Sequence, residues 1–217
     1  MNLKILFVDN RDSFAYNIIE LLRQLGTEPD IITYNTGRNS TNTLIHNIIS
    51  TINSHDTDNL RTHLALYDGI VLSPGAGIPD EYPIMQSILH SRTTTPILGI
   101  CLGHQAIAQT GGAHLLCMPQ PLHGHTSHLT PLAPRHWIFD NVNDHCDIGR
   151  YHSWVVDPKS IGASDITPIA TDENGNIQAI CHRSLPYIGL QFHPESIITT
   201  EGKQIIANWL ENIGKNH

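Results

Sequence analysis

A short segment near the middle of the chain, Pro96–Gln105, limits the possible folds more than any other. It begins as an apolar run and continues as Gly99-Ile100-Cys101-Leu102-Gly103, after which the pattern is that of a helix that closes before Gly111. An abrupt strand-to-helix turn with small residues on both sides is typical of an open α/β sheet. Cys101 is therefore expected at the carboxyl edge of a buried strand.

The first half of the chain alternates between apolar runs of strand length and helical patterns. The runs are residues 3–8, 30–34, 69–72 and 96–100. Between the first two lies a helix, for which Asp12 or Ser13 offers an N-terminal cap and Gly26 a stop signal. This alternation predicts an α/β fold of the flavodoxin-like kind, a mostly parallel central sheet with helices on both faces.

Shorter strand patterns fill the second half. They cover residues 113–117, 151–156, 166–170, 177–181 and 187–192. The sequence Glu-Asn-Gly-Asn at 173–176 predicts a hairpin turn, because Asn and Gly tolerate a positive φ. A last helix is expected from Glu201 to Ile213. Because no repeat or linker interrupts the pattern, residues 1–217 are predicted to form a single domain.

Residues 36–66 are rich in Asn, Thr, Ser, His and Asp. Their apolar side chains fit one helix, and the polar remainder is expected to be a loop. The apolar face of that helix consists of Leu44, Ile45, Ile48, Ile49 and Ile52.

The composition argues against several kinds of protein. A net charge of -8, from 12 basic and 20 acidic side chains, makes nucleic-acid binding unfavourable because phosphates require clustered Lys and Arg. No apolar run has the length needed to span a bilayer. The four cysteines lack the spacing of a disulfide framework or a zinc site. We therefore expect a cytoplasmic protein.

Cys101 has the local surroundings of a nucleophile. A position at the N-terminus of a helix favours the thiolate over the thiol, and the amide of Leu102 can donate to an oxyanion at the same place. An isolated cysteine is more often a small buried residue, and this interpretation holds for Cys117, Cys146 and Cys181. For Cys101 the flanking glycines favour catalysis.

A cysteine nucleophile needs a histidine, and the histidine needs a group that orients it. Among 15 histidines, His193 is singled out because it follows an apolar strand and so reaches the sheet edge. Glu195 lies two residues further along, on the same side of an extended backbone. A surface His-Pro-Glu turn is the alternative, but the pairing with the Cys101 segment favours a catalytic site.

The loop Ser73–Gly77 follows the third strand. Its two glycines allow a close approach to a ligand, so it is a candidate for a second oxyanion donor. A plain strand-to-helix turn is the alternative. A phosphate loop is excluded because no Gly-Lys-Ser/Thr follows.

Together these motifs resemble the class I, triad-type glutamine amidotransferases. The resemblance rests on Gly-Ile-Cys-Leu-Gly-His-Gln at 99–105 and Gln-Phe-His-Pro-Glu-Ser at 191–196. Segments 9–17, 122–127 and 150–156 are similar to the small subunits of anthranilate synthase and aminodeoxychorismate synthase. The likeness runs from about residue 3 to 213 and excludes 36–66. It implies the α/β sheet described above, with a smaller antiparallel sheet.

The resemblance also implies a role for each matching position. Cys101 would be the nucleophile, and His193 and Glu195 would complete the triad. The glutamine and oxyanion site would consist of Gly75, Ala76, Gly77, Leu102, Gln105, Ser153 and Trp154, the last two acting through backbone atoms. The substrate would be L-glutamine, and the ammonia would go to a chorismate-binding synthase subunit. No cofactor is expected in this chain, and Mg²⁺ is expected on the partner.

Four positions depart from the family's pattern. Ala76 stands where Pro is usual, Trp154 where Leu is usual, His125 where Lys is usual and Arg11 where Tyr is usual. The tryptophan and folate pathways both stay open. So do two other activities, a partner-independent γ-glutamyl hydrolase or peptidase and a non-catalytic regulatory binding module, although the intact triad argues against the second.

Three nearby histidines, His123, His125 and His128, form the last candidate site. No carboxylate or cysteine lies at a matching spacing, so we expect surface or interface histidines rather than a metal site.

Overall fold

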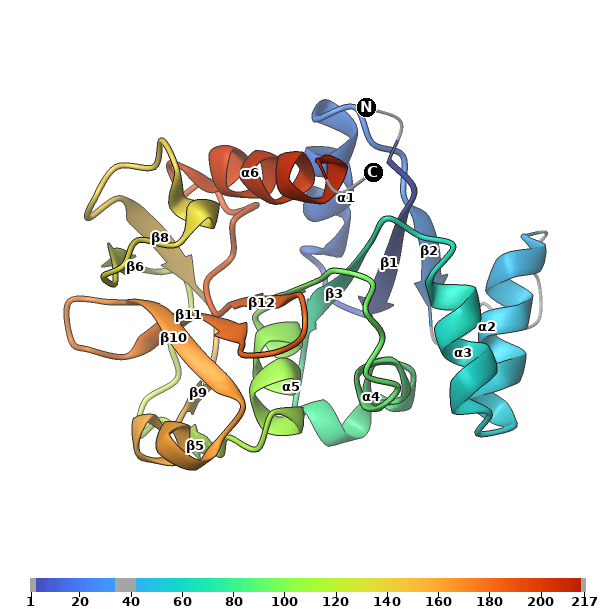
Figure 1. Cartoon of the computed structure of the whole chain (residues 1–217). Coiled ribbons are helices and arrows are strands. Elements are labelled where there is room, and N and C mark those ends of the chain that lie inside the picture. The colour runs from blue at the N-terminus through green and yellow to red at the C-terminus, as the bar shows by residue number, and fades with distance from the viewer. Residues whose placement is uncertain (1–2, 34–41, 216–217) are drawn as a thin grey trace.

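The computed structural model describes residues 3–33 and 42–215 (Figure 1). The helices are α1 (Ala15–Gln24), α2 (Thr43–Asn53), α3 (Thr57–Leu64), α4 (Pro83–His90), α5 (Leu102–Thr110) and α6 (Gly202–Gly214). The strands are β1 (Ile5–Asn10), β2 (Asp30–Thr33), β3 (Gly69–Gly75), β4 (Ile97–Ile100), β5 (Leu115–Cys117), β6 (His125–His128), β7 (Thr130–Pro131), β8 (Asp147–Arg150), β9 (Trp154–Val156), β10 (Ile166–Thr171), β11 (Ile177–His182) and β12 (Tyr187–Leu190).

A central sheet runs through the molecule in the order β2-β1-β3-β4-β12-β11-β10-β7. The strands from β2 to β12 pair in parallel, and β11, β10 and β7 continue the same sheet in antiparallel fashion. The predicted α/β class with a mostly parallel sheet is confirmed. Two separate antiparallel ladders, β5-β9 and β6-β8, supply the small sheets.

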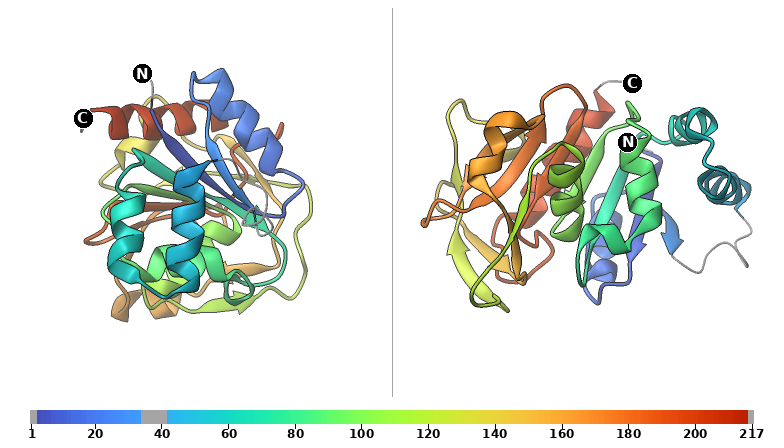
Figure 2. Two further views of the ribbon diagram at one scale, coloured as in Figure 1. Left: turned by 90° about the vertical axis from the view of Figure 1, so that its right-hand side faces the viewer. Right: turned by 90° about the horizontal axis from the view of Figure 1, so that it is seen from below.

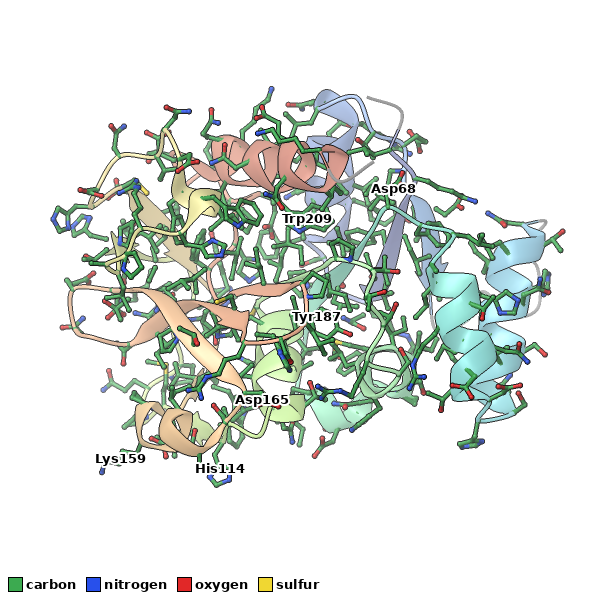
Figure 3. The ribbon with its side chains drawn as sticks, viewed as in Figure 1. Asp68, His114, Lys159, Asp165, Tyr187 and Trp209 are labelled. Carbon is green, nitrogen blue, oxygen red and sulfur yellow. The ribbon has the colours of Figure 1, made fainter. Side chains whose placement is uncertain are left out.

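Side chains that alternate along the parallel strands build a core on each face of the sheet. On β1, Ile5 and Phe7 pack with α1 and α6, whereas Leu6 and Val8 belong to the core that includes α2, α3, α4 and α5. Trp209 of α6 points toward the sheet (Figure 3) and lies so close to β3 that a Cβ at Gly69 would be 2.7 Å from its ring. Helices therefore cover both faces, as predicted.

The segment before β3 differs from the prediction. The helix expected within residues 36–66 is present as α2, but the expected polar loop contains a second helix, α3. The Asp56 side chain caps α3 by accepting from the Asn59 amide, and Leu60 and Leu64 bury one face of it. Two apolar residues one turn apart predict a helix only weakly from sequence. Helix α3 is stabilised by the core against which Leu60 and Leu64 pack. The two helices lie side by side beyond β2 (Figure 2).

Other boundaries also shift. Asp12 does not cap α1 directly; its carboxylate accepts from the Phe14 amide, and Phe14 is the residue before the helix. The last residue of the predicted 30–34 strand and residues 36–41 lie outside the described residues. Helix α4 was not predicted. The ladder β6-β8 was also not predicted, because β6 is a polar, mostly exposed His-Thr-Ser-His. The 151–156 prediction shortens to β9, and the 187–192 prediction shortens to β12.

Within residues 3–33 and 42–215, none of the helices combines the length and apolar character needed to cross a membrane.

Candidate active site

Three neighbouring strands end at one edge of the central sheet. Strands β3, β4 and β12 are adjacent and parallel, so the residues that follow them meet at their carboxyl ends. Cys101 follows β4 directly, and His193 follows β12 by three positions. Gly75 is the last residue of β3. Segments far apart in the sequence are thus gathered where open α/β sheets bind their ligands.

The turn at Cys101 is strained, as its glycine neighbours predict. Cys101 has φ 52° and ψ -98°, a conformation that non-glycine residues rarely adopt and that persists only where the surroundings enforce it. A Cβ at Gly99 would lie 2.5 Å from the Gly103 carbonyl group, and one at Gly103 would lie 2.5 Å from the Leu72 oxygen. Both positions therefore require glycine, and the Cys101 amide is anchored by donating to Leu190 at 2.8 Å.

His193 and Glu195 form a buried pair beside Cys101. The distance from His193 Nδ1 to Glu195 Oε1 is 2.6 Å, and the two side chains are 2% and 0% exposed. Burial by itself lowers the pKa of His193, but interactions with the Cys101 sulfur and with Glu195 outweigh it and hold that pKa well above its usual range. The His193 Nε2 atom is buried and has no regular hydrogen-bond partner among residues 3–33 and 42–215.

The backbone of His193 is held on both sides. Its amide donates to the Gly149 oxygen at 3.0 Å, and its carbonyl oxygen accepts from the Thr199 hydroxyl at 2.6 Å. The Thr199 hydroxyl oxygen in turn accepts from the Gly149 amide at 2.9 Å. A Cβ at Gly149 would lie 2.7 Å from the Ser196 hydroxyl oxygen, so a larger residue there would displace this loop.

Two aromatic rings pack against the His193 imidazole. The ring centroid of Tyr151 is 5.0 Å away and that of Phe14 is 5.4 Å away, both in edge-on arrangements. The Tyr151 hydroxyl group also lies 3.1 Å from the Ser196 hydroxyl group. These contacts restrict rotation of the imidazole and exclude water from its faces.

The loop Gly75–Gly77 lies next to the Cys101 turn. A Cβ at Gly75 would be 2.5 Å from a methyl carbon of Leu102, and Gly77 has a φ of +72°. The Tyr82 hydroxyl donates to the Ala76 oxygen at 2.8 Å and so fixes the loop from outside. The loop therefore lies beside the first residue of α5, and its oxyanion role stays a prediction.

The remaining predicted residues are used partly within the protein. Gln105 is buried and donates to the Trp154 oxygen at 2.9 Å, and the Ser153 oxygen accepts from the Met118 amide at 2.7 Å. Leu102 is buried as the first residue of α5. Their predicted contacts with glutamine stay predictions.

His123 and His128 have different partners in the structure. His123 packs edge-on against Tyr151, and the exposed His128 of β6 pairs with Asp147 of β8 at 3.0 Å. In the part of the chain that the structure describes, no three His, Cys, Asp or Glu side chains are grouped to hold a metal ion.

Several residues around His193 were not predicted, namely Phe14, Gly149, Tyr151, Gln191, Thr199 and Gly202. Phe14, Tyr151 and Gln191 belong to segments that the sequence already singled out, but nothing local assigns them to the imidazole or the sulfur. Gly149 and Gly202 have no local signal, because a Cβ at these positions would meet the Ser196 side chain and the Pro194 carbonyl oxygen, which only the fold brings there.

Gly202 offers a direct test of the backbone around Pro194. A Cβ at Gly202 would lie 1.8 Å from the Pro194 oxygen, so the segment between His193 and Glu195 must move to admit it. We expect Gly202→Ala to lower the free energy of unfolding by about 1–3 kcal/mol in urea denaturation. The matched control is Gly162→Ala, because a Cβ at Gly162 meets nothing within 4 Å. Equal stabilities for the two variants would contradict the argument.

A model of the family "Glutamine amidotransferase class-I" matches residues 6–213. The chain therefore belongs to the class I glutamine amidotransferase family. Within this family it is similar to named synthase components. It is 37% identical over 214 residues to anthranilate synthase component 2 of Mycobacterium tuberculosis (strain CDC 1551 / Oshkosh), covering 98% of this chain and 83% of that protein.

Two further relatives agree. The chain is 35% identical over 212 residues to aminodeoxychorismate/anthranilate synthase component 2 of Bacillus subtilis (strain 168), covering 97% of each. Among solved structures it is similar to a protein of Thermoplasma acidophilum named as one of the subunits of GMP synthase. That likeness has a TM-score of 0.76 and 25% identity and covers 100% of this chain and 96% of the other. The structural match extends over the whole sheet and confirms the fold.

Proposed function

We propose that this chain is a glutaminase subunit that hydrolyses L-glutamine through a thioester on Cys101 and delivers ammonia to a chorismate-using synthase subunit. The observation that carries the proposal is the buried triad: Cys101 on a strained turn, with His193 and Glu195 joined at 2.6 Å beside it. Membership of the amidotransferase family supports the activity. The names of the relatives, components of anthranilate and aminodeoxychorismate synthases, support the partner.

The first half of the reaction forms the thioester. The Cys101 thiolate attacks the side-chain carbonyl carbon of glutamine, and the carbonyl electrons move to the oxygen. Amides of Leu102 and of the Gly75–Gly77 loop are suited to receive this oxyanion, each donor being worth about 3 kcal/mol of barrier. Imidazolium at His193 then gives its proton to the amide nitrogen, the carbon–nitrogen bond breaks, and ammonia leaves.

The second half regenerates the thiolate. Water attacks the thioester carbon while His193 accepts its proton, and the carbon–sulfur bond breaks to release glutamate. The sum is glutamine and water to glutamate and ammonia, with the Cys101 thiolate and the His193 imidazolium restored. Glu195 favours the imidazolium in both halves by accepting from Nδ1.

The partner is needed because ammonia reacts as a nucleophile only while it is unprotonated, and enclosure keeps the released ammonia from being protonated and lost to solvent. A docked synthase subunit would provide the enclosure and, by the family resemblance, the Mg²⁺ and the chorismate site. The relatives include components of both the anthranilate and the aminodeoxychorismate reactions, so the proposal covers chorismate-using synthases as a class. The cytoplasmic location and the single domain stay predictions.

Covalent labelling with a diazo-ketone analogue of glutamine tests the proposal. We expect one adduct in the intact mass, located on Cys101 by peptide mapping and suppressed by excess glutamine. The exposed Cys117 serves as an internal control for non-specific alkylation. Labelling should be repeated with a chorismate-binding synthase subunit present, because docking can complete the oxyanion site.

The outcomes separate the alternatives. An adduct on Cys101 that glutamine suppresses supports the glutaminase. Turnover of γ-glutamyl peptides without a partner would indicate a hydrolase instead. No adduct on Cys101 with or without the synthase subunit would overturn the proposal in favour of a binding module.

A further inference from the structure

A buried glutamine contacts the nucleophile directly. Gln191 lies between β12 and His193 and is fully buried. Its side-chain Nε2 is 3.8 Å from the Cys101 sulfur, within the range of an N–H···S hydrogen bond. Its backbone amide donates to the Gln178 oxygen at 2.8 Å, so the main chain is fixed. The triad chemistry described above assigns this amide no role.

The orientation of the Gln191 amide follows from a backbone carbonyl group. The Trp154 oxygen can only accept, so Gln105 must present its Nε2 to it, at 2.9 Å. The same Gln105 nitrogen lies 3.3 Å from the Gln191 Oε1 and donates to it. The Gln191 oxygen is thereby occupied, and its nitrogen faces Cys101. The flipped amide would turn two NH₂ groups toward each other and an oxygen lone pair toward the sulfur.

The Trp154 carbonyl group is itself held by a donor of fixed polarity. His152 Nδ1 lies 3.0 Å from the Trp154 oxygen, and Arg150 Nε lies 3.2 Å from His152 Nε2. Because a guanidinium group only donates, His152 Nε2 accepts and the proton stays on Nδ1, where it donates to Trp154.

The charge state of His152 keeps this arrangement constant. Burial first, and then repulsion from Arg150, lowers the pKa of His152 to about 3. The ring therefore stays neutral around pH 7 and retains one tautomer. Arg150 is anchored in turn by Asp172 at 2.5 Å, with both side chains buried.

We propose that Gln191 is a further catalytic residue, whose amide N–H donates to the Cys101 sulfur and stabilises the thiolate. Gln105 and His152 are positioning residues that fix the direction of this donor. A hydrogen bond to an ion is about twice as strong as one between neutral groups, and the buried surroundings strengthen it further. The inference rests on the proposed role of Cys101 as nucleophile.

The test replaces the amide with a side chain of similar length that has no donor, Gln191→Met. The rate of Cys101 alkylation by iodoacetamide is measured from pH 5 to 10 by peptide mass mapping, with exposed Cys117 as the reference thiol in the same sample. We expect the midpoint of the Cys101 profile to rise by about one pH unit. Below the midpoint, alkylation should be about tenfold slower, which corresponds to about 1.4 kcal/mol.

The matched control is Gln109→Met on the same helix as Gln105. The Gln109 Oε1 is buried and forms no hydrogen bond with described residues, and Gln109 has no part in the chain of donors. Its profile should match that of the parent protein. A second variant, Gln105→Met, leaves the Gln191 amide free to rotate and should raise the midpoint in the same direction by a smaller amount.

Each outcome has one meaning. A folded Gln191→Met protein with the parent profile overturns the inference. If Gln191→Met does not fold, Gln105→Met decides, and an unchanged midpoint there overturns it. Failure of the glutaminase proposal is recognised separately, because the parent Cys101 would then not react with the diazo-ketone analogue whatever the alkylation profiles show.

Discussion

Replacing Cys101 by alanine is expected to abolish glutamine-dependent product formation by the complex with a chorismate-binding synthase subunit. The loss should be at least about 1000-fold, because the thioester is formed on the Cys101 sulfur and alanine has no nucleophile to replace it. Synthesis from added ammonium salt should continue at the parent rate, since external ammonia bypasses the triad. Both rates are measured on the same reconstituted complex, at a pH where free ammonia is appreciable.

The control for this variant is Cys181→Ala. Cys181 is a partly buried thiol on β11 whose pKa is raised by burial, and it lies away from the triad. Both activities should survive its loss. If Cys101→Ala instead removed the ammonium-dependent activity as well, Cys101 would be needed for assembly rather than for chemistry.

Asp172→Asn is expected to lower the free energy of unfolding by about 3–5 kcal/mol, because it leaves the buried Arg150 guanidinium without a counter-charge. The two side chains are 3% and 0% exposed and lie 2.5 Å apart. Asparagine keeps an oxygen for the turn, where Asp172 Oδ1 accepts from the amides of Asn174 and Asn176 at 2.9 and 2.8 Å. It places an NH₂ group where Asp172 Oδ2 accepts from Arg150, Asn176 and Gln178. The change therefore removes both the charge and an acceptor, and chemical denaturation measures the combined cost.

An exposed pair of the same chemistry provides the comparison. Arg23 and Glu28 lie 2.7 Å apart, with side chains 44% and 69% exposed. Solvent screens this pair, so Glu28→Gln should lower the free energy of unfolding far less than Asp172→Asn does. A loss for Asp172→Asn no larger than that for Glu28→Gln would mean that Arg150 is solvated or neutralised in another way.

Sequence reasoning succeeded where the signal is local. The strand before Cys101, the tight turn and the helix after it are all specified by neighbours in the chain. The glycines at 99 and 103 show why, since a Cβ at either would meet backbone at 2.5 Å. The sequence did not predict α3 or β6, because these elements are short and mostly polar. Helix α3 has only two buried leucines, and β6 is His-Thr-Ser-His. Such elements gain their stability from the surfaces on which they pack.

By itself, the sequence of this protein determined the α/β class and predicted Cys101, His193 and Glu195 as nucleophile, base and orienting acid. These follow from periodicity and from short motifs whose members are close in the chain. Only the tertiary structure decided which other groups surround them. The direction of the Gln191 amide depends on Gln105 and Trp154, and the His193 imidazole is clamped by Phe14 and Tyr151. Hydrogen bonds and ring contacts act over a few ångströms of space, and only folding brings residues so distant in sequence within that range.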